Sequence, residues 1–280
     1  MKIEFLKYQN CGNDFILVDD LDLGDNRCGQ IKEATKKLMI HKYGVGADNV
    51  LYLHSSSNAD AFMRIYNVSD IEGENCGNGL LCVGKYLCQK LGTDLVLIET
   101  LGGISKVEKI SANIFKLKLG AISFECQYVK RFFSLSDKGN LEVHIPLGEG
   151  KTVFGSVVHA GEPHLVIVDE DLENADLKGL GDIINKNKAV FPLGMNVDLV
   201  KVVGENKIRL RTYERSCFEE TEACGTGSCC SAFIVIKLGL LNHSLIEVSV
   251  NGGKLFVDFS GNDAYLSGEP KLVYAGSLNL

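Results

Sequence analysis

The feature that most constrains this chain is a motif that occurs twice. Cys-Gly-x-Gly-x-x-Cys runs from Cys76 to Cys82 and again from Cys224 to Cys230. Because several other features return in the same order and at nearly the same spacing, the chain contains two copies of one domain. These features are Lys90-Leu91-Gly92 with Lys237-Leu238-Gly239, Leu97-Ile98-Glu99 with Leu245-Ile246-Glu247, Gly102-Gly103 with Gly252-Gly253, and Arg64-x-Tyr66 with Arg211-x-Tyr213.

The duplication predicts two similar halves, residues 1–120 with Cys76 and residues 121–268 with Cys224. In each half, short strand-like segments surround one largely apolar segment, 80–91 or 228–238, which is typical of a buried helix. Both helical segments end in Lys-Leu-Gly, which favours a left-handed stop, and the paired glycines predict hairpin turns. The expected fold class is α+β, with two pseudo-symmetric halves, each a barrel-like, mostly antiparallel sheet around a central helix.

Composition excludes several classes of function. The 280 residues carry a formal net charge of −7, which argues against a nucleic-acid partner or an anionic membrane surface. No window has the ~18 uncharged apolar residues of a spanning helix, and the strand-like N-terminus has no signal-peptide core. We therefore expect a soluble, cytoplasmic protein without a membrane partner.

The ten cysteines do not imply a disulfide scaffold in a chain of this length. The sequence has no Cys-x-x-Cys pair and its histidines are scattered, so we expect no bound metal. Cys82, Cys88, Cys229 and Cys230 lie along the two apolar helices and are interpreted as core side chains.

Cys76 and Cys224 need a different interpretation, because each precedes a glycine-rich turn that opens a helix. Such a turn aims backbone N–H groups at one point and makes an anion site. It also lowers a thiol pKa from about 8.5 toward neutrality, where the thiol can act as acid or base. A cysteine hydrolase needs a histidine partner, and a redox enzyme needs neighbouring thiols. A duplicated thiol best fits an isomerase with one acid and one base on opposite faces of a carbon.

The chain resembles the diaminopimelate epimerase family, whose members invert an amino-acid carbon without pyridoxal phosphate. The resemblance covers nearly the whole chain and implies the fold above, with the tail 269–280 completing the first half. It also implies a small amino-acid substrate, no cofactor, and interconversion of LL- and meso-diaminopimelate for lysine and peptidoglycan synthesis; a homodimer is the assembly we consider. The motifs that carry it are Gly12-Asn13-Asp14-Phe15, Asp48-Asn49, Arg64-Ile65-Tyr66-Asn67, Asn75-Cys76-Gly77-Asn78-Gly79, Pro163-His164, Asn196, Tyr213-Glu214-Arg215 and Ala223-Cys224-Gly225-Thr226-Gly227.

The resemblance also implies roles for single residues. Cys76 and Cys224 would be the two catalytic thiols, and His164 and Glu214 would tune their pKa values. Backbone N–H groups would hold the α-carboxylate, and amide side chains would read the amino and carboxylate groups. Glu214 and Arg215 would bind the distal end of the substrate, since a guanidinium pairs bidentately with a carboxylate. The backbone set is Gly77, Asn78, Gly225 and Thr226, and the amide set is Asn13, Asn49, Asn67 and Asn196.

The sequence departs from the family at the substrate end. The usual Gly-Asn-Pro-His is Gly161-Glu162-Pro163-His164 here, so a carboxylate that would attract an ammonium replaces an amide. The segment between Glu214 and Cys224 is also altered. A racemase of the same family acting on a cationic amino acid therefore stays an alternative. So do a non-catalytic amino-acid-binding protein and, less favoured, a thiol-redox protein; singly, the asparagines could be ordinary turn residues and Glu214-Arg215 a surface pair.

Overall fold

The computed structural model describes residues 2–22, 28–67, 72–124, 134–136, 139–148, 151–261 and 263–279. The chain divides into two compact units. The first unit comprises Met1–Lys118 with Ser267–Leu280, and the second comprises Leu119–Leu266. Each unit is described by itself below.

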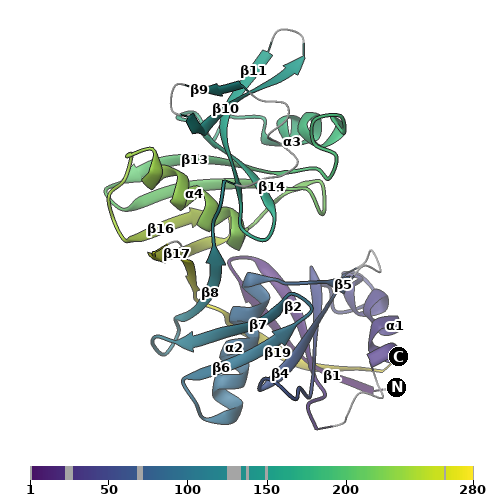
Figure 1. Ribbon diagram of the computed structural model, residues 1–280. Coiled ribbons are helices and arrows are strands. Elements are labelled where there is room, and N and C mark those ends of the chain that lie inside the picture. The colour runs from purple at the N-terminus through teal and green to yellow at the C-terminus, as the bar shows by residue number, and fades with distance from the viewer. Residues whose placement is uncertain are drawn as a thin grey trace. The chain divides into compact units, whose positions relative to one another are not determined.

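The strands of the first unit are mostly antiparallel, and two helices lie between them in the chain (Figure 1). Two strand pairs are parallel, β2 with β3 and β4 with β6. The C-terminal strand β19 pairs antiparallel with β1, from Lys2 opposite Asn279 to Gln9 opposite Lys271. The elements are β1 (Lys2–Asn10), β2 (Asn13–Asp19), α1 (Cys28–Met39), β3 (Asn49–His54), β4 (Ala61–Tyr66), β5 (Glu72–Gly73), α2 (Gly77–Leu91), β6 (Leu95–Thr100), β7 (Gly103–Lys109), β8 (Phe115–Ala121) and β19 (Lys271–Asn279).

From β11 onward, the second unit repeats the order and pairing of the elements from β1, and β9 and β10 precede this repeat. Its parallel pairs are β12 with β13 and β14 with β16, and α3 and α4 occupy the places of α1 and α2 in the order. The elements are β9 (Ser134–Ser136), β10 (Gly139–Gly148), β11 (Lys151–His159), β12 (Pro163–Val168), α3 (Leu177–Lys186), β13 (Asn196–Gly204), β14 (Lys207–Glu214), β15 (Glu219–Thr221), α4 (Gly225–Lys237), β16 (Leu245–Val250), β17 (Gly253–Ser260) and β18 (Asp263–Gly268).

Strand register matches residues of one unit to residues of the other. Phe15 lies opposite Asn49 in the β2–β3 pair, as His164 lies opposite Asn196 in the β12–β13 pair. In the next pair, Val50 faces Tyr66 as Val197 faces Tyr213. We call residues matched in this way counterparts. The counterparts used below are Asn13 and Glu162, Phe15 and His164, Asn49 and Asn196, Leu51 and Asp198, Asn67 and Glu214, and Cys76 and Cys224.

A buried helix lies among the strands of each unit: α2 contacts β1, β6 and β7, and α4 contacts β12, β13 and β17 (Figure 1). The mostly antiparallel α+β fold with a central helix is therefore confirmed. The four helical cysteines at positions 82, 88, 229 and 230 are buried, as expected. Both helices begin three residues earlier than predicted, because the glycine motif forms their first turn rather than a preceding loop.

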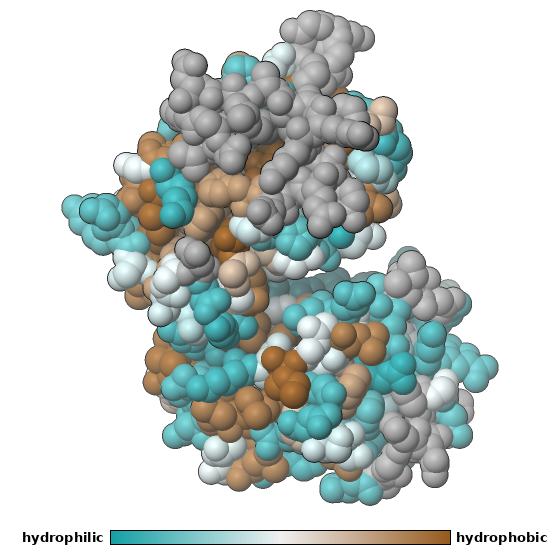
Figure 2. All heavy atoms as spheres, in the orientation of Figure 1, coloured by the Kyte–Doolittle hydropathy of each residue, from teal (hydrophilic) through white to brown (hydrophobic). Residues whose placement is uncertain are grey.

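Local turn chemistry follows the sequence. Gly92 ends α2 in the left-handed conformation at φ 69°, and Gly239, just after α4, has φ 71°. Thr100 pairs with Gly103 and Val250 with Gly253, so the glycine pairs form the expected hairpin turns. Hydrophilic residues cover much of the visible face of the first unit (Figure 2). Among the described residues, no helix is long and apolar enough to cross a membrane.

Candidate active site

Cys76 caps the N-terminus of α2. Its Sγ accepts the backbone N–H of Gly79 at 3.4 Å, and the residue is partly exposed. The preceding strand β5 is held by a bidentate ion pair, in which Arg64 donates Nε and an Nη to the two carboxylate oxygens of Glu72 at 2.7 and 2.6 Å. The thiol therefore sits at a defined helix end, beside N–H groups that have no partner within the helix.

The side chains near this helix end are mainly amides. Asn10 donates to the Asn78 oxygen at 2.9 Å, and Asn78 donates to Asn13 at 3.3 Å. Asn13 in turn donates to Asp48 at 2.7 Å. We call Asn10, Asn13, Asp48, Cys76 and Asn78 the Cys76 cluster. It brings together Asn13 and Asn78, two of the residues predicted to bind substrate.

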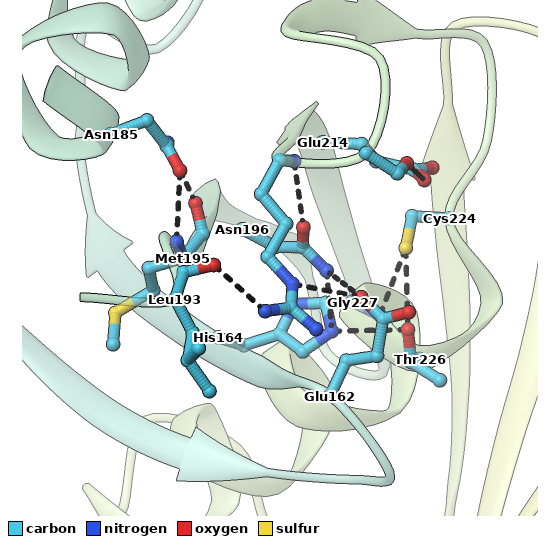
Figure 3. A network of polar contacts seen from close by, with 12 residues as sticks. Glu162, His164, Asn185, Leu193, Met195, Asn196, Glu214, Cys224, Thr226 and Gly227 are labelled. Atoms are coloured by element: carbon cyan, nitrogen blue, oxygen red, sulfur yellow. Dashed lines mark hydrogen bonds and ion pairs between the residues drawn. The ribbon is translucent and has the colours of Figure 1, made fainter. Parts of the chain in front are cut away.

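Cys224 caps α4 in the same way, with Gly227 N–H donating to Sγ at 3.4 Å (Figure 3). Its Sγ also lies 3.3 Å from the hydroxyl of Thr226, and the residue is only 7% exposed. Burial, followed by the charges of Glu214 and Asp198, raises the pKa of Cys224 well above its ordinary value. The predicted lowering is therefore wrong for Cys224, because one N–H and one hydroxyl do not offset the loss of water and two nearby carboxylates.

His164 stands behind Cys224. Its Nδ1 lies 2.7 Å from Asp198 Oδ2 and its Nε2 lies 3.0 Å from Thr226 Oγ1, with both His164 and Asp198 at 0% exposure. Burial alone would lower the pKa of His164, but the charge and hydrogen bond of Asp198, aided by Glu162 and Glu214, raise it above the ordinary value. The ring is thus placed to gain or lose a proton next to the thiol.

Asn196 joins His164 to the substrate-end residues. Its Nδ2 lies 3.3 Å from His164 Nε2 and donates to Glu162 Oε2 at 3.2 Å, while its Oδ1 accepts the backbone N–H of Arg215 at 2.9 Å. Asn185 of α3 braces the preceding residue by bonding both backbone groups of Met195, each at 2.9 Å (Figure 3). The start of β13 is therefore fixed from two sides.

Glu162 and Arg215 form an ion pair, with Arg215 Nε 3.4 Å from Glu162 Oε2. Arg215 also donates to the carbonyl of Leu193 at 3.0 Å. Glu214 accepts the Thr221 hydroxyl at 2.9 Å, and burial raises the pKa of its carboxyl. We call the whole set the Cys224 cluster: Glu162, His164, Asn196, Asp198, Thr212, Glu214, Arg215, Cys224 and Thr226.

A family model for diaminopimelate epimerase matches residues 5–124 and 156–273. The chain belongs to this family. A diaminopimelate epimerase of Elusimicrobium minutum is 32% identical over 98% of both chains, and one of Caldanaerobacter subterraneus subsp. tengcongensis is 34% identical over 99% of this chain and 100% of its own. The fold is shared with a hydroxyproline epimerase from Agrobacterium vitis at a TM-score of 0.69, with 13% identity over 99% of this chain and 92% of that one. The chain is therefore an isomerase of the epimerase class.

In this family member, sequence reasoning named most of the polar residues that each unit gathers around its cysteine. Asn49 begins β3 and Asn67 follows β4; both are partly buried. Gly77 and Gly225 form the first turns of the two helices. Among the described residues, no three His, Cys, Asp or Glu side chains are grouped so as to hold a metal ion.

Asp198 and its partner Thr212 were missed. Thr212 donates its hydroxyl to Asp198 Oδ1 at 2.7 Å, and both are buried. One signal was present in the sequence: Asp198 interrupts the apolar strand Val197-Asp198-Leu199-Val200 on the same face as Asn196. A charged residue in a buried strand requires a partner, and the partner is His164.

Proposed function

We propose that this chain interconverts LL- and meso-diaminopimelate without a cofactor, using Cys76 and Cys224 as its two acid–base groups. The observation that carries the proposal is the repeated cap, in which a cysteine sulfur accepts the N–H three residues along at 3.4 Å in both units. The substrate is supported by relatives of nearly equal length that bear the name of this epimerase.

In the proposed mechanism, the α-carboxylate binds backbone N–H groups at the two helix ends, from Gly77 and Asn78 and from Gly225 and Thr226. These donors stabilise the negative charge that moves onto the carboxylate as the α-proton leaves. Asn13, Asn49, Asn67 and Asn196 contact the amino and carboxylate groups, and Glu214 with Arg215 binds the distal end.

The proton balance needs one thiolate and one thiol. The thiolate removes the α-proton from one face, and the thiol delivers its proton to the other face, so the two cysteines exchange protonation states in each turnover. Burial beside two carboxylates keeps the proton on Cys224 in the resting chain, which makes Cys224 the acid and Cys76 the base in the first half of the reaction.

The test uses one isomer in deuterated water. Newly formed product should carry deuterium at the inverted carbon while remaining substrate stays largely protonated early in the reaction, because the two thiols hold separate protons. Cys76→Ala and Cys224→Ala should each abolish inversion, whereas Cys217→Ala, at an exposed cysteine that caps neither helix, serves as the matched control. An alanine variant at position 76 or 224 that still epimerises within about tenfold of the parent would contradict the mechanism.

Glu162 favours a second candidate within the family, a racemase of a cationic amino acid. Its carboxylate stands where the family has an amide, and such a group attracts a side-chain ammonium. A chiral-product screen of diaminopimelate against lysine, ornithine, arginine and histidine, with no pyridoxal phosphate added, separates the two candidates by their kcat/KM values.

A further inference from the structure

The structure holds a connected chain of polar groups behind Cys224. Asp198 bonds His164 Nδ1, His164 Nε2 lies against Thr226 Oγ1, and Thr226 Oγ1 lies against Cys224 Sγ, with successive separations of 2.7, 3.0 and 3.3 Å (Figure 3 shows the last two). We propose that Asp198 is a positioning residue that fixes the His164 ring so that the Thr226 hydroxyl carries protons between Cys224 and His164.

The hydrogen bonds around the ring identify its tautomer. The Asn196 oxygen is occupied by the backbone N–H of Arg215, so the Asn196 amide nitrogen is the group that faces His164 Nε2 at 3.3 Å. A donor at that place needs an acceptor, which puts the neutral ring's proton on Nδ1, facing Asp198. The lone pair on Nε2 then accepts from both Asn196 Nδ2 at 3.3 Å and the nearer Thr226 hydroxyl at 3.0 Å, and the Thr226 proton is the one that can be transferred.

Asp198 is itself held in one orientation. Thr212 donates to its Oδ1 at 2.7 Å, leaving Oδ2 for His164. A Cβ added at Gly227 would lie 2.6 Å from Asp198 Oδ1, so the first turn of α4 packs directly on this carboxylate. The ring, the hydroxyl and the thiol are thereby held by one buried support.

The transfer is balanced without another reactant. The proton leaves Cys224 Sγ for Thr226 Oγ1 as the hydroxyl's own proton moves to His164 Nε2, while the Nδ1 proton stays between the ring and Asp198. The product is a thiolate–imidazolium pair of unchanged net charge. This gives the buried thiolate a nearby cation, which it needs because burial disfavours an isolated anion.

Other charged groups face this pair. Glu162 precedes β12, Glu214 ends β14 and Arg215 follows it. His159 lies at the end of β11, and burial, followed by the charge of His164, lowers its pKa. All of them are retained in the variants below. The relay rests on the proposed function for its use in turnover, but its existence can be tested on the protein alone.

The first measurement is the ring tautomer, read by NMR on the full chain with ¹⁵N-labelled histidine and the His164 signals correlated to its backbone. Above its titration, His164 should carry its proton on Nδ1. In Asp198→Asn, Thr212 keeps the oxygen on its own side, so the amide nitrogen faces Nδ1 and moves the ring proton to Nε2. A parent ring protonated on Nε2 would overturn the proposal.

The second measurement is the coupling between the thiol and the ring. Cys224→Ala should lower the apparent pKa of His164 by roughly 0.1–0.3 unit, because the minor thiolate–imidazolium form of the pair no longer contributes to the titration. Cys76→Ala, the matched change in the first unit, should move it far less. In a Thr226→Val background, which removes the bridging hydroxyl at similar volume, Cys224→Ala should add nothing further.

Two results would refute the relay in this experiment. Either the His164 titration is the same in the parent and Cys224→Ala, or Cys76→Ala shifts it as much as Cys224→Ala does. Because no substrate is present, these outcomes are independent of whether diaminopimelate is the substrate. If the relay is found and epimerisation is not, only the proposed function fails.

Discussion

The two units share a backbone plan but differ in what surrounds the cysteine. The Cys76 cluster is mainly amide side chains around a partly exposed thiol, whereas the Cys224 cluster surrounds a buried thiol with titratable groups. The difference is sharpest at two counterpart pairs, where Phe15 and Leu51 in the first unit correspond to His164 and Asp198 in the second. The duplication kept the helix-end cap and diverged in the charges behind it.

Burial explains the divergence. A partly exposed thiolate is stabilised by water as well as by helix N–H groups, so apolar residues behind it are tolerated. A buried thiolate has no water, and without a cation its formation would be strongly disfavoured. The burial of Cys224 therefore explains why an imidazole and a carboxylate stand behind it. Replacing His164 and Asp198 with the residue types of their counterparts tests this explanation.

The largest expected effect comes from giving the second unit the first unit's apolar pair. His164→Phe alone should lower the free energy of unfolding by about 3–5 kcal/mol, because Asp198 is left as an unpaired buried charge. His164→Phe with Asp198→Leu should recover most of this loss, apart from roughly 1 kcal/mol for the Thr212 hydroxyl. Epimerisation should stay at least ~10²-fold below the parent in both variants.

Urea unfolding and initial rates on the same preparations measure both effects. The reverse change in the first unit, Phe15→His with Leu51→Asp, is the control. A carboxylate at position 51 would lack the hydroxyl donor that Thr212 gives Asp198, because Ile65 and Tyr66 occupy the corresponding part of β4. If the variant with His164→Phe and Asp198→Leu keeps near-parent activity, the charge difference between the units has no role in turnover.

Much of the fold could be read from the sequence, because the repeat is recorded in local signals. The Lys-Leu-Gly stops, the glycine-pair hairpins and the apolar helices each specify a neighbourhood of a few residues. The helix starts were displaced because a cysteine is not among the usual N-cap residues, so the first turn was taken for a loop. Strand pairing, and hence the counterparts, required register that no local signal supplies.

The sites were predictable in identity but not in energetics. Motifs located Cys224, His164 and Glu214, yet the direction of the Cys224 pKa shift depends on burial and on Asp198, which tertiary packing determines. Likewise, the sequence predicts that Glu162 faces the substrate but does not predict its ion pair with Arg215. That pair depends on how β12 and β14 lie in the folded unit.

The next-largest effect on stability should come from an arginine–glutamate ion pair that occurs once in each unit. Arg211 binds Glu220 bidentately, as Arg64 binds Glu72, but Arg211 also donates to the carbonyls of Leu172 at 2.6 Å and Ala175 at 3.1 Å. Its side chain is 14% exposed against 31% for Arg64. Arg211→Met should therefore reduce unfolding free energy by about 2–3 kcal/mol.

Arg64→Met should reduce the free energy of unfolding by only about 1 kcal/mol, because the Arg64 side chain is more exposed than that of Arg211. Thermal and urea unfolding of the two variants side by side provide the measurement. Equal losses would mean that the deeper burial of the Arg211 side chain adds no stability.

A smaller effect should appear in the pH dependence of stability. The pKa of His164 is raised on folding, so its contribution is complete below about 6.5 and is lost as pH rises through the folded value. The parent should thus lose unfolding free energy relative to the His164→Phe, Asp198→Leu variant above pH 6.5, by up to ~1.4 kcal/mol per pH unit. His159, whose pKa is lowered, acts in the opposite direction and is present in both chains. Parallel stability curves between pH 6 and 8.5 would contradict the assignment.

The smallest effect on stability should come from Glu162→Asn, which installs the residue type of its counterpart Asn13. The ion pair is long and exposed, with side-chain exposures of 25% for Arg215 and 46% for Glu162, so unfolding free energy should change by less than about 1 kcal/mol. Substrate choice should change more, because Arg215 loses its carboxylate partner while its hold on the Leu193 carbonyl remains. The freed guanidinium can pair with a distal carboxylate, so kcat/KM for diaminopimelate relative to lysine should rise about three- to tenfold.

Glu162→Gln, neutral at nearly the same length, should give the same direction, whereas Glu173→Gln, which breaks the exposed ion pair of Glu173 with Arg209, should leave the ratio unaltered. A ratio within about twofold of the parent in both position-162 variants would mean that the carboxylate points away from bound substrate, and that this difference between the units concerns charge balance rather than specificity.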